Sequence, residues 1–393
     1  MTFERKIAFR CCCLLSVILF ISSCGSSEGT VATVENPNTE SISDSNTDTN
    51  SNDDMSIPGN VRDITSFQLV AEMGVGWNLG NSFDVIARDK TTWGNPLPNK
   101  AIIDAVREIG FTTLRIPITW NFHQQSTTPY TIEEDYLDRV QSIVNYGLQN
   151  KMHVIVNVHH DDDDWLRPTF TDEPEVSRRL ERTWTQIAER FKVYGDSLIF
   201  EAMNEPRLKG SPEEWTGGTS EGRQVVNNLH KVALDAIRAT GGNNANRHIM
   251  ISTYAAGTSS AALNDLVIPN NDPNVIISQH SYFPWPFAGE GAVEWGSDQD
   301  RAELDAELDK IYNKWIVQEN RPVILGEWGT VGSNNINQRL DYADYYARGA
   351  MERGMLPVVW DDGGNFILFE RHNLTWRHRD IAEAIIQASS SRK

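Results

Sequence analysis

The chain has 393 residues, of which 39% are apolar, so it is long enough for one large domain with a sizeable core. Its formal charge of −19 and the lack of a Lys/Arg cluster exclude the basic face that nucleic-acid binding needs, and we attribute the acidity to solubility. All cysteines lie within the first 24 residues, which excludes disulfides and cysteine metal sites from the rest of the chain.

The N-terminus has the pattern of an export signal. Arg5, Lys6 and Arg10 precede an apolar run over residues 11–21, which is shorter than a membrane span requires. The segment ISSC at 21–24 then resembles the lipobox of bacterial lipoproteins, which implies removal of residues 1–23 and lipidation of Cys24. The alternative is an ordinary signal peptide that is cleaved nearby.

Residues 24–57 are rich in Ser, Thr, Asn and Asp and contain almost nothing apolar. Such a segment cannot offset its ordering entropy by burial, so we expect a flexible linker. The prediction is an exported lipoprotein that is tethered to a bacterial membrane or cell surface by its lipid anchor only. Its catalytic domain would span residues 58–393, and we expect a monomer.

From residue 60 onward, strand patterns alternate with helical ones at intervals of about 40 residues, as in repeated βα units. For example, Ile102, Ile103 and Val106 share one face of a predicted helix. The strands are predicted to end near Trp77, Arg115, His159, Glu205, Ser252, His280, Glu327 and Trp360. The short interval after Ser252 leaves room only for a small helix near Ala261. The pattern predicts an α/β fold, a single closed (β/α)8 TIM barrel over residues 60–388. An open doubly wound sheet is the alternative, but no glycine-rich phosphate loop follows the first strand.

Two glutamates, Glu205 and Glu327, each follow an apolar run of strand length. They lie about three βα units apart, which predicts the fourth and seventh strands, across the barrel mouth from each other. Carboxylates at the carboxyl ends of barrel strands are placed for chemistry, and glycosidic bond cleavage requires two of them. We therefore predict a glycoside hydrolase that needs no cofactor.

Other polar residues of the predicted strands would support these glutamates. Glu201, deeper on the strand of Glu205, is interpreted as a structural group that pairs with a buried base. Arg115 lies on a buried strand and demands a carboxylate, either Glu327 or Glu201. His280 and Tyr282 are two residues apart, so both would point to one face and hydrogen-bond carboxylates.

Adjacent histidines, His159 and His160, would point to opposite faces of a regular strand, one toward the barrel mouth and one toward its rim. Four aspartates follow at 161–164, which raises the possibility of a metal site. We expect no metal, because adjacent histidines chelate poorly and a loop aspartate run is typically solvated. Six tryptophans at predicted strand ends or loops are interpreted as rim indoles for sugar stacking: Trp93, Trp120, Trp165, Trp285, Trp328 and Trp360.

At these residues the chain resembles glycoside hydrolase family 5, the retaining (β/α)8 endoglucanase family whose clan carries Asn-Glu on strand four. The resemblance covers most of residues 72–385 and is greatest to the bacterial subfamily 4, which acts on β-1,4-glucans and xyloglucan. It rests on the motifs GWNLGN (76–81), WGNP (93–96), LRIP (114–117), NVHHD (157–161), FEAMNEPR (200–207), EEWTGGT (213–219), RATGGNN (238–244), HSY (280–282) and LGEWG (325–329).

The resemblance implies that Glu205 is the acid/base and Glu327 the nucleophile. It further implies that Arg115 and Tyr282 support Glu327, that His280 contacts Glu205, and that Asn204 binds the sugar 2-hydroxyl. His159 would line the reacting subsite and Trp360 would form its floor. Neighbouring sugar subsites are implied for Asn81, Asp84, Trp93 and His160. The acid must start protonated, so we expect its surroundings to raise the pKa of Glu205.

The expected substrate is a β-glucan polysaccharide, cut internally: cellulose-type, mixed-linkage or xyloglucan. Other specificities within the family, mannanase or xylanase, stay open. Two alternatives belong to other classes: a glycan-binding lipoprotein on an inactive barrel, and a metal-dependent deacetylase. The presence of both glutamates disfavours the first, because binding alone needs no acid/base pair.

Overall fold

The computed structural model describes residues 57–86 and 92–391. The predicted export signal, the lipidation site at Cys24 and nearly all of the predicted linker lie outside the described residues. None of the helices in the described part of the chain combines the length and apolar content that crossing a bilayer requires.

Eight parallel strands close into a barrel in which each strand pairs with its neighbours in chain order and β8 pairs with β1. The closed ring confirms the predicted (β/α)8 fold and rules out the open sheet. The strands are β1 (Gly76–Asn78), β2 (Thr113–Ile116), β3 (His153–Asn157), β4 (Leu198–Glu201), β5 (Ile249–Ser252), β6 (Val275–His280), β7 (Val323–Trp328) and β8 (Leu356–Val359).

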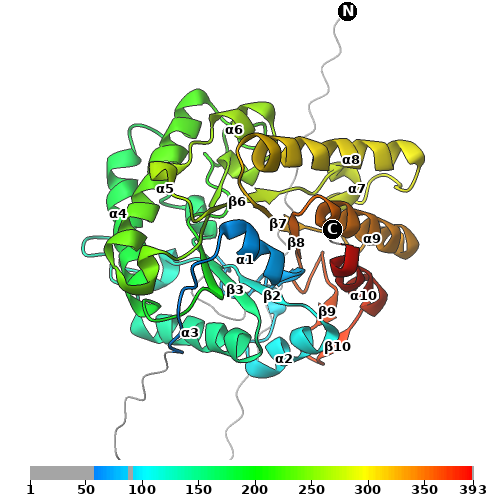
Figure 1. The fold of residues 1–393 in the computed structure, drawn as a ribbon, viewed down its shortest axis with the longest axis horizontal. Coiled ribbons are helices and arrows are strands. Elements are labelled where there is room, and N and C mark those ends of the chain that lie inside the picture. The colour runs from blue at the N-terminus through cyan, green and yellow to red at the C-terminus, as the bar shows by residue number, and fades with distance from the viewer. Residues whose placement is uncertain (1–56, 87–91, 392–393) are drawn as a thin grey trace, which may run out of the picture. The chain divides into compact units, whose positions relative to one another are not determined.

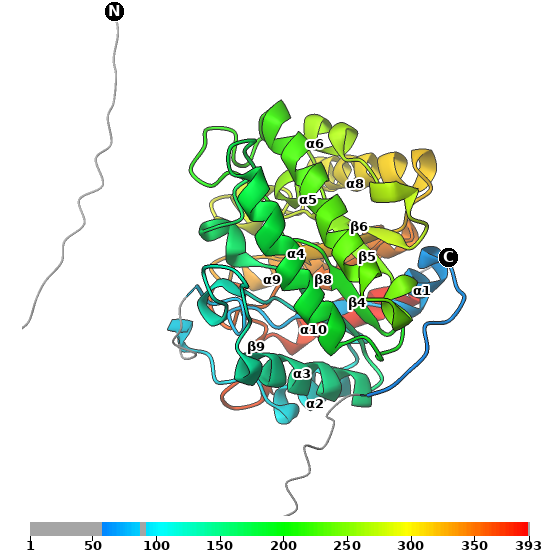
Figure 2. The same ribbon diagram turned by 90° about the vertical axis from the view of Figure 1, so that its left-hand side faces the viewer.

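Helices surround this barrel, and one of them, α1, lies across its end (Figure 1). They are α1 (Ser66–Met73), α2 (Lys100–Ile109), α3 (Glu134–Gln149), α4 (Glu173–Arg190), α5 (Ser220–Ala239), α6 (Ser260–Asp265), α7 (Trp285–Ala288), α8 (Asp298–Tyr312), α9 (Ile336–Glu352) and α10 (Arg379–Ala388). Helix α2 buries Ile102, Ile103 and Val106 as its periodicity predicts, and α6 is the small helix expected near Ala261. Long helices α4 and α5 pack side by side on the outside of the ring (Figure 2).

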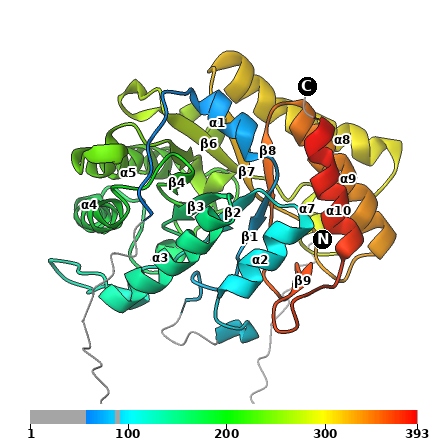
Figure 3. The ribbon, with the colours of Figure 1, turned by 60° about the horizontal axis from the view of Figure 1, so that its bottom comes forward.

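One end of the barrel is closed by α1, which lies across the ring (Figures 1 and 3). Thr65 caps this helix with a reciprocal capping box, and its apolar face presents Leu69, Val70 and Met73. These side chains pack against the inward residues of the strands, including Ile155 and Ile199, in one fully buried cluster. In the described part of the chain, the carboxyl end of the barrel is therefore the end that α1 leaves open to a ligand.

At that carboxyl end the chain leaves the strands irregularly. Strand β4 ends at Glu201, four residues earlier than predicted, so Glu205 lies in the following loop. The loop still follows its neighbours, because the backbone N–H of Ala202 donates to Met250 and that of Asn204 donates to Val158. Short strands β9 (Phe369–Glu370) and β10 (Thr375–Trp376) form a separate hairpin in the connection between β8 and α10.

Candidate active site

The side chain of Arg115, on β2, is completely buried and uses all five of its N–H donors. Nε and Nη2 contact Glu201 at 2.8 and 2.7 Å, and Nη1 donates to Asn78 at 2.9 Å. Nη1 also donates to Glu327 at 2.8 Å, and Nη2 donates to Asn204 at 2.6 Å. Both carboxylates that the sequence offered as alternative partners are therefore bound by one guanidinium.

Glu201 is the deeper of the carboxylates and does not reach the cavity. It is fully buried, accepts from Asn157 Nδ2 at 2.9 Å and Ser278 Oγ at 2.6 Å, and pairs with Arg115. These contacts compensate its charge completely within the barrel. The interpretation of Glu201 as a structural group paired with a buried base is confirmed.

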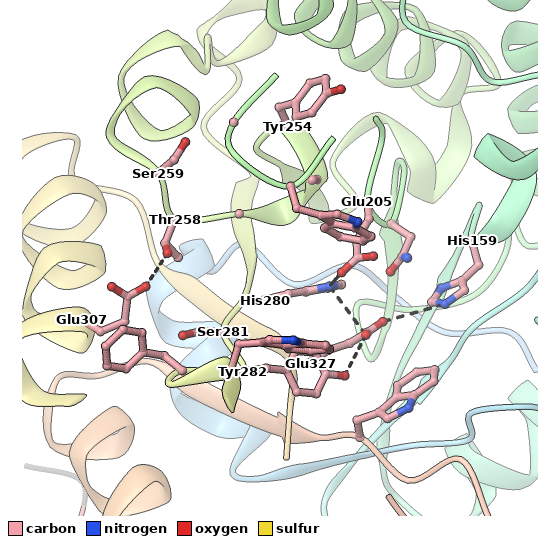
Figure 4. A pocket seen from close by; sticks show the side chains of 18 of the residues that line it. His159, Glu205, Tyr254, Thr258, Ser259, His280, Ser281, Tyr282, Glu307 and Glu327 are labelled. Carbon is pink, nitrogen blue, oxygen red and sulfur yellow. Dashed lines mark hydrogen bonds and ion pairs between the residues drawn. The ribbon is translucent and has the colours of Figure 1, made fainter. Parts of the chain in front are cut away.

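Glu327 lies on β7, and its two carboxylate oxygens face different partners (Figure 4). Oε1 accepts from Arg115, and Oε2 accepts from the Tyr282 hydroxyl at 3.1 Å. Burial raises the pKa of Tyr282 well above its ordinary value, so its phenol stays protonated and donates. The preceding residue, Gly326, leaves room for this arrangement, because a Cβ there would lie 3.0 Å from His280 Nε2.

Glu205 is hydrogen-bonded to His280, with 2.8 Å between Oε1 and Nδ1, and its Oε2 lies 3.6 Å from Arg207. Burial raises the pKa of Glu205, but the hydrogen bond and charge of His280 outweigh it, and the net shift is downward. For His280, burial lowers the pKa, yet the charge of Glu327 and the hydrogen bond to Glu205 raise it overall. The expected rise in the pKa of Glu205 was therefore wrong: the pKa of Glu205 is shifted down and that of His280 is shifted up, which favours the shared proton on His280.

His159 is buried, with its Nε2 3.8 Å from Glu327 Oε1. Burial, together with neighbouring cations, lowers its pKa well below the ordinary value, so the ring is neutral. Its Nδ1 accepts from the Asn157 amide at 3.0 Å, which leaves the proton on Nε2, facing Glu327. The Trp360 indole lies parallel to this ring, with centroids 5.9 Å apart.

Asn204 has one half of its amide fixed and the other half free. Its Oδ1 accepts from Arg115, whereas its buried Nδ2 has no hydrogen-bond partner among the described residues, and the residue lines the cavity. A buried unsatisfied donor is costly unless a ligand completes it. This amide is therefore available to donate to an oxygen that enters the site.

A cavity of about 780 Å³ opens over these groups. One carboxylate oxygen each of Glu205 and Glu327 and a ring nitrogen of His280 lie within 4.8 Å of one another. The predicted residues that the structure brings together in the cavity wall are His159, His160, Asn204, Glu205, His280, Tyr282, Glu327 and Trp360. Arg115 lies directly beneath them.

Three predicted subsite residues do not line this cavity. Asp84 is fully buried and accepts from the backbone N–H groups of Asn81 and Ser82, so its carboxylate shapes the loop after β1; burial raises its pKa to about 6. Asn81 has φ of +51° in the same loop and accepts from Asn95 through its carbonyl oxygen. The Trp93 side chain is exposed on the rim.

Of the six tryptophans interpreted as rim indoles, Trp285 and Trp360 line the cavity, and Trp165 is half-buried against the core, where it donates to Asp161. The interpretation was wrong for Trp120 and Trp328. Trp120 is fully buried and donates to the Asn157 carbonyl, and Trp328 is stacked on Tyr346 between the barrel and α9. Trp328 directly follows Glu327 on β7, so strand alternation sends its side chain to the opposite face, and a position near a strand end does not by itself place an indole on the rim.

The expectation of a solvated aspartate run was also wrong for its first two members. Asp161 is buried and accepts from the backbone N–H groups of Trp120 and Asn121, and Asp162 pairs with Arg207.

Several residues that sequence reasoning missed also line the cavity: Trp215, Tyr254, Thr258, Ser259, Glu307 and Phe366. Only Trp215 had a signal, because it lies within the EEWTGGT motif. The others come from loops and from α8, where nothing in the residue pattern indicates a direction.

Three groups of described side chains have the spacing of a metal site. Their carboxylates are already engaged: Asp84 by backbone N–H groups, Asp162 by Arg207 and Asp163 by Lys209. The third group consists of Glu205, His280 and Glu327. Arg115 and Tyr282 hold its Glu327, so a cation there would compete with an arginine.

The chain is similar to known proteins of one family. The family model described as cellulase (glycosyl hydrolase family 5) matches residues 78–365. The chain belongs to glycoside hydrolase family 5. Endoglucanase B of Clostridium cellulovorans is 47% identical over 343 residues, which cover 84% of this chain and 77% of that protein.

Solved structures of family 5 proteins are also similar to this chain in sequence and in fold. The structure of ZgEngAGH5_4 in complex with a cellotriose is 53% identical, with a TM-score of 0.83 over 84% of this chain and all (100%) of that one. XEG5A, a xyloglucan-specific endo-β-1,4-glucanase from a metagenomic library, was also solved with cellotriose; it is 33% identical, with a TM-score of 0.78 over 82% of this chain and 98% of that one. The resemblance to family 5 endoglucanases of subfamily 4 is thereby confirmed, and the chain is a glycoside hydrolase.

Proposed function

We propose that this enzyme is a retaining endo-β-1,4-glucanase in which Glu327 is the nucleophile and Glu205 the acid/base. The observation that carries the proposal is the approach of the two carboxylates, whose nearest oxygens lie within 4.8 Å. Retaining glycosidases hold the two carboxyl groups about 5 Å apart, whereas inverting enzymes separate them by about 6.5–9.5 Å to admit a water.

In the first step Glu327 attacks the anomeric carbon and Glu205 protonates the departing oxygen. Arg115 donates to one oxygen of the nucleophile, and the Tyr282 hydroxyl donates to the other. The proton for Glu205 comes across the 2.8 Å hydrogen bond from His280 Nδ1. Once a sugar displaces water from the site, the charged pair of Glu205 carboxylate and protonated His280 loses solvation. The neutral forms of both residues are then favoured, with the proton on Glu205.

In the second step Glu205, now a carboxylate, activates a water that releases the sugar from Glu327. The glycosyl ester has lost the negative charge of Glu327, and that charge is one cause of the raised pKa of His280. Loss of the Glu327 charge weakens proton binding by the His280–Glu205 pair. This favours the change of Glu205 from acid in the first step to base in the second.

Three groups around Glu327 are placed to bind the reacting sugar. The free Nδ2 of Asn204 would donate to its 2-hydroxyl, His159 would donate through Nε2, and Trp360 would offer a flat apolar face. Interactions with the 2-hydroxyl strengthen at the transition state of glycoside hydrolysis, so the unsatisfied amide of Asn204 serves catalysis as well as binding.

The proposed substrates are polymers of β-1,4-linked glucose, including carboxymethylcellulose, mixed-linkage β-glucan and xyloglucan. The cellotriose complex of ZgEngAGH5_4 and the xyloglucan specificity of XEG5A support this choice. Endo-cleavage predicts rapid viscosity loss with few new reducing ends. Viscosity that falls only in step with cellobiose release, or mannan as the best substrate, would contradict the proposal.

Stereochemistry tests the mechanism directly. Proton NMR of the earliest hydrolysis products should show the β-anomer of the new reducing end, because two inversions restore the configuration of the β-glucan. An α-anomer as the first product would contradict the double displacement.

We also propose that the enzyme is a lipoprotein held on a membrane through Cys24, on the basis of its N-terminal sequence. Cys24→Ala should release the enzyme from membranes with kcat and KM unchanged. Unchanged membrane association in that variant would contradict the lipid anchor.

A further inference from the structure

The Trp360 indole, the flat apolar face proposed for the reacting sugar, lies against the loop that follows β1. Its backbone N–H donates to Trp328 at 2.8 Å, and the edge of its ring contacts Gly80 of the GWNLGN motif. A Cβ at Gly80 would lie 2.8 Å from Trp360 Cζ2, so only a glycine lets the indole come this close to the backbone. The position of the ring therefore depends on where the loop after β1 is held.

One side chain, that of Arg371, binds the backbone on both sides of this indole. Arg371 directly follows the short strand β9, and its side chain is only 1% exposed. Its Nη1 donates to the Gly80 carbonyl and its Nη2 donates to the Asp361 carbonyl, each at 2.5 Å. The backbone N–H of Gly80 also donates to the Asp361 carbonyl, at 3.1 Å. The guanidinium therefore ties the loop after β1 to the residue that follows Trp360.

The Asp361 side chain brings Arg371 into this position. It is completely buried, and its Oδ2 accepts from Trp77 Nε1 and from the backbone N–H of Phe369, both at 3.0 Å. Arg371 Nη2 lies 3.5 Å from Asp361 Oδ1 and supplies the counter-charge that a buried carboxylate needs. An ion pair alone would not require the two carbonyl contacts. Because the guanidinium is rigid and planar, those contacts fix the separation of the two carbonyls.

We propose that Arg371 is a positioning residue, which holds the Trp360 indole where the reacting sugar needs it. By fixing the Gly80 and Asp361 carbonyls relative to each other, it keeps the indole against Gly80 and parallel to the His159 ring. This inference rests on the proposed function, because it takes Trp360 as the surface against which the reacting sugar lies. A displacement of about 1 Å in such a surface can cost about 10²-fold in rate, even when its cause lies far from the chemistry.

A double-mutant cycle between Arg371 and Trp360 tests the proposal. Arg371→Lys keeps the charge beside Asp361 but lacks the fork that spans both carbonyls. It should lower kcat/KM on 2,4-dinitrophenyl β-cellobioside about tenfold in the wild-type background. In the Trp360→Ala background the loss should be less than about twofold, because no indole remains to be positioned. Equal losses in the two backgrounds, or none in either, would overturn the proposal and leave Arg371 as a structural partner of Asp361.

Arg377→Lys is the matched control, because Arg377 follows β10 of the same hairpin, is exposed and pairs with Glu370 at 3.3 Å. It should leave kcat/KM within about twofold of wild type. The indole itself can be followed by ¹⁹F NMR of enzyme labelled with 5-fluorotryptophan. The Trp360 resonance, identified by its loss in Trp360→Ala, should shift in Arg371→Lys and not in Arg377→Lys. An unmoved resonance in Arg371→Lys would overturn the proposal.

If Arg371→Lys does not fold, Gly80→Ala serves instead, because its methyl group meets the edge of the indole directly. A larger loss of kcat/KM is again expected in the wild-type background than in Trp360→Ala, and an equal loss in both would overturn the proposal. A first product of α configuration from the wild-type enzyme would instead contradict the proposed function, whatever the cycle shows.

Discussion

The two halves of the active site hold their carboxylates by different physical means. Glu327 lies on a barrel strand, its side chain is 7% exposed, and a fully buried arginine on another strand binds it. Glu205 lies in a loop, its side chain is 14% exposed, and its nearest partner is a histidine that titrates. One half therefore maintains a fixed charge, whereas the other half exchanges a proton.

This difference matches what each step of the proposed reaction demands. A nucleophile must be ionised before the substrate arrives, and Arg115 is charged at every accessible pH. An acid/base must change its protonation state twice in each turnover, which a permanent ion pair at 2.8 Å would oppose. The Arg207 guanidinium lies 3.6 Å from the Glu205 carboxylate and donates instead to the Glu205 backbone carbonyl at 3.1 Å, so it adds positive potential without a hydrogen bond to the carboxylate.

Replacing the nucleophile should have the largest effect. Glu327→Ala should lower kcat on every substrate by about five orders of magnitude or more, because no glycosyl-enzyme can form. Azide should restore turnover only as the inverted α-glycosyl azide, identified by NMR. A β-glycosyl azide from this variant would mean that the two roles are reversed.

Replacing the acid/base should separate substrates by their leaving group. Glu205→Ala should lower kcat/KM on β-glucan about 10²–10⁴-fold, the contribution of general acid catalysis. With 2,4-dinitrophenyl β-cellobioside, the first step should survive, because that leaving group needs no proton, and a burst of dinitrophenolate should appear. Azide should then give the retained β-glycosyl azide. Absence of the burst would contradict the assignment.

Removing the charge of Arg115 should lower the stability of the protein as well as its activity. Arg115→Met leaves Glu201 and Glu327 buried without a counter-ion, so the free energy of unfolding should fall by about 3–5 kcal/mol. Arg379→Met is a suitable control, because that arginine is an exposed partner of Glu383 on α10 and should change stability by less than about 0.5 kcal/mol. Urea denaturation measures both; an unchanged midpoint for Arg115→Met would refute the comparison.

Altering the titrating half should act mainly on pH dependence. The raised pKa of His280 places the alkaline limb of kcat/KM above 6.5, its ordinary value, because the His280–Glu205 pair must keep its proton to act as an acid. His280→Gln should move this limb to lower pH, since Glu205 alone binds that proton less tightly. Glu303→Gln, a change at an exposed residue of α8, should leave the limb in place, and an unmoved limb in His280→Gln would refute the shared proton.

The same pair should contribute to stability within a pH window. Because the pKa of His280 is raised in the folded state, its contribution to stability is complete below pH of about 6.5 and disappears as the pH rises through the folded pKa. Because the pKa of Glu205 is lowered in the folded state, its contribution is complete above pH of about 4.5 and disappears as the pH falls through the folded pKa. The stability lost in His280→Gln should therefore be greatest between these values.

The sequence by itself determined the barrel, its eight strands and the placement of Glu205 and Glu327 at the barrel mouth. Apolar runs recur at a regular interval and each ends at polar residues, and a parallel sheet must bury both faces, so this periodicity admits few folds. The buried arginine of β2 likewise had to meet a carboxylate, because an unpaired charge in the core is too costly.

Only the tertiary structure decided which way the loop side chains point and how tightly the buried groups bind protons, because both depend on neighbours that are distant in sequence. Trp120 and Trp328 point into the core while Trp215 and Trp285 face the cavity, although all four lie near strand ends or in loops. The pKa of Glu205 falls because β6 places His280 2.8 Å from it, a contact between a strand residue and a residue in the loop after β4. Glu307 reaches the same cavity from an outer helix, where helical periodicity predicts burial but cannot tell a packed core from the wall of a binding site.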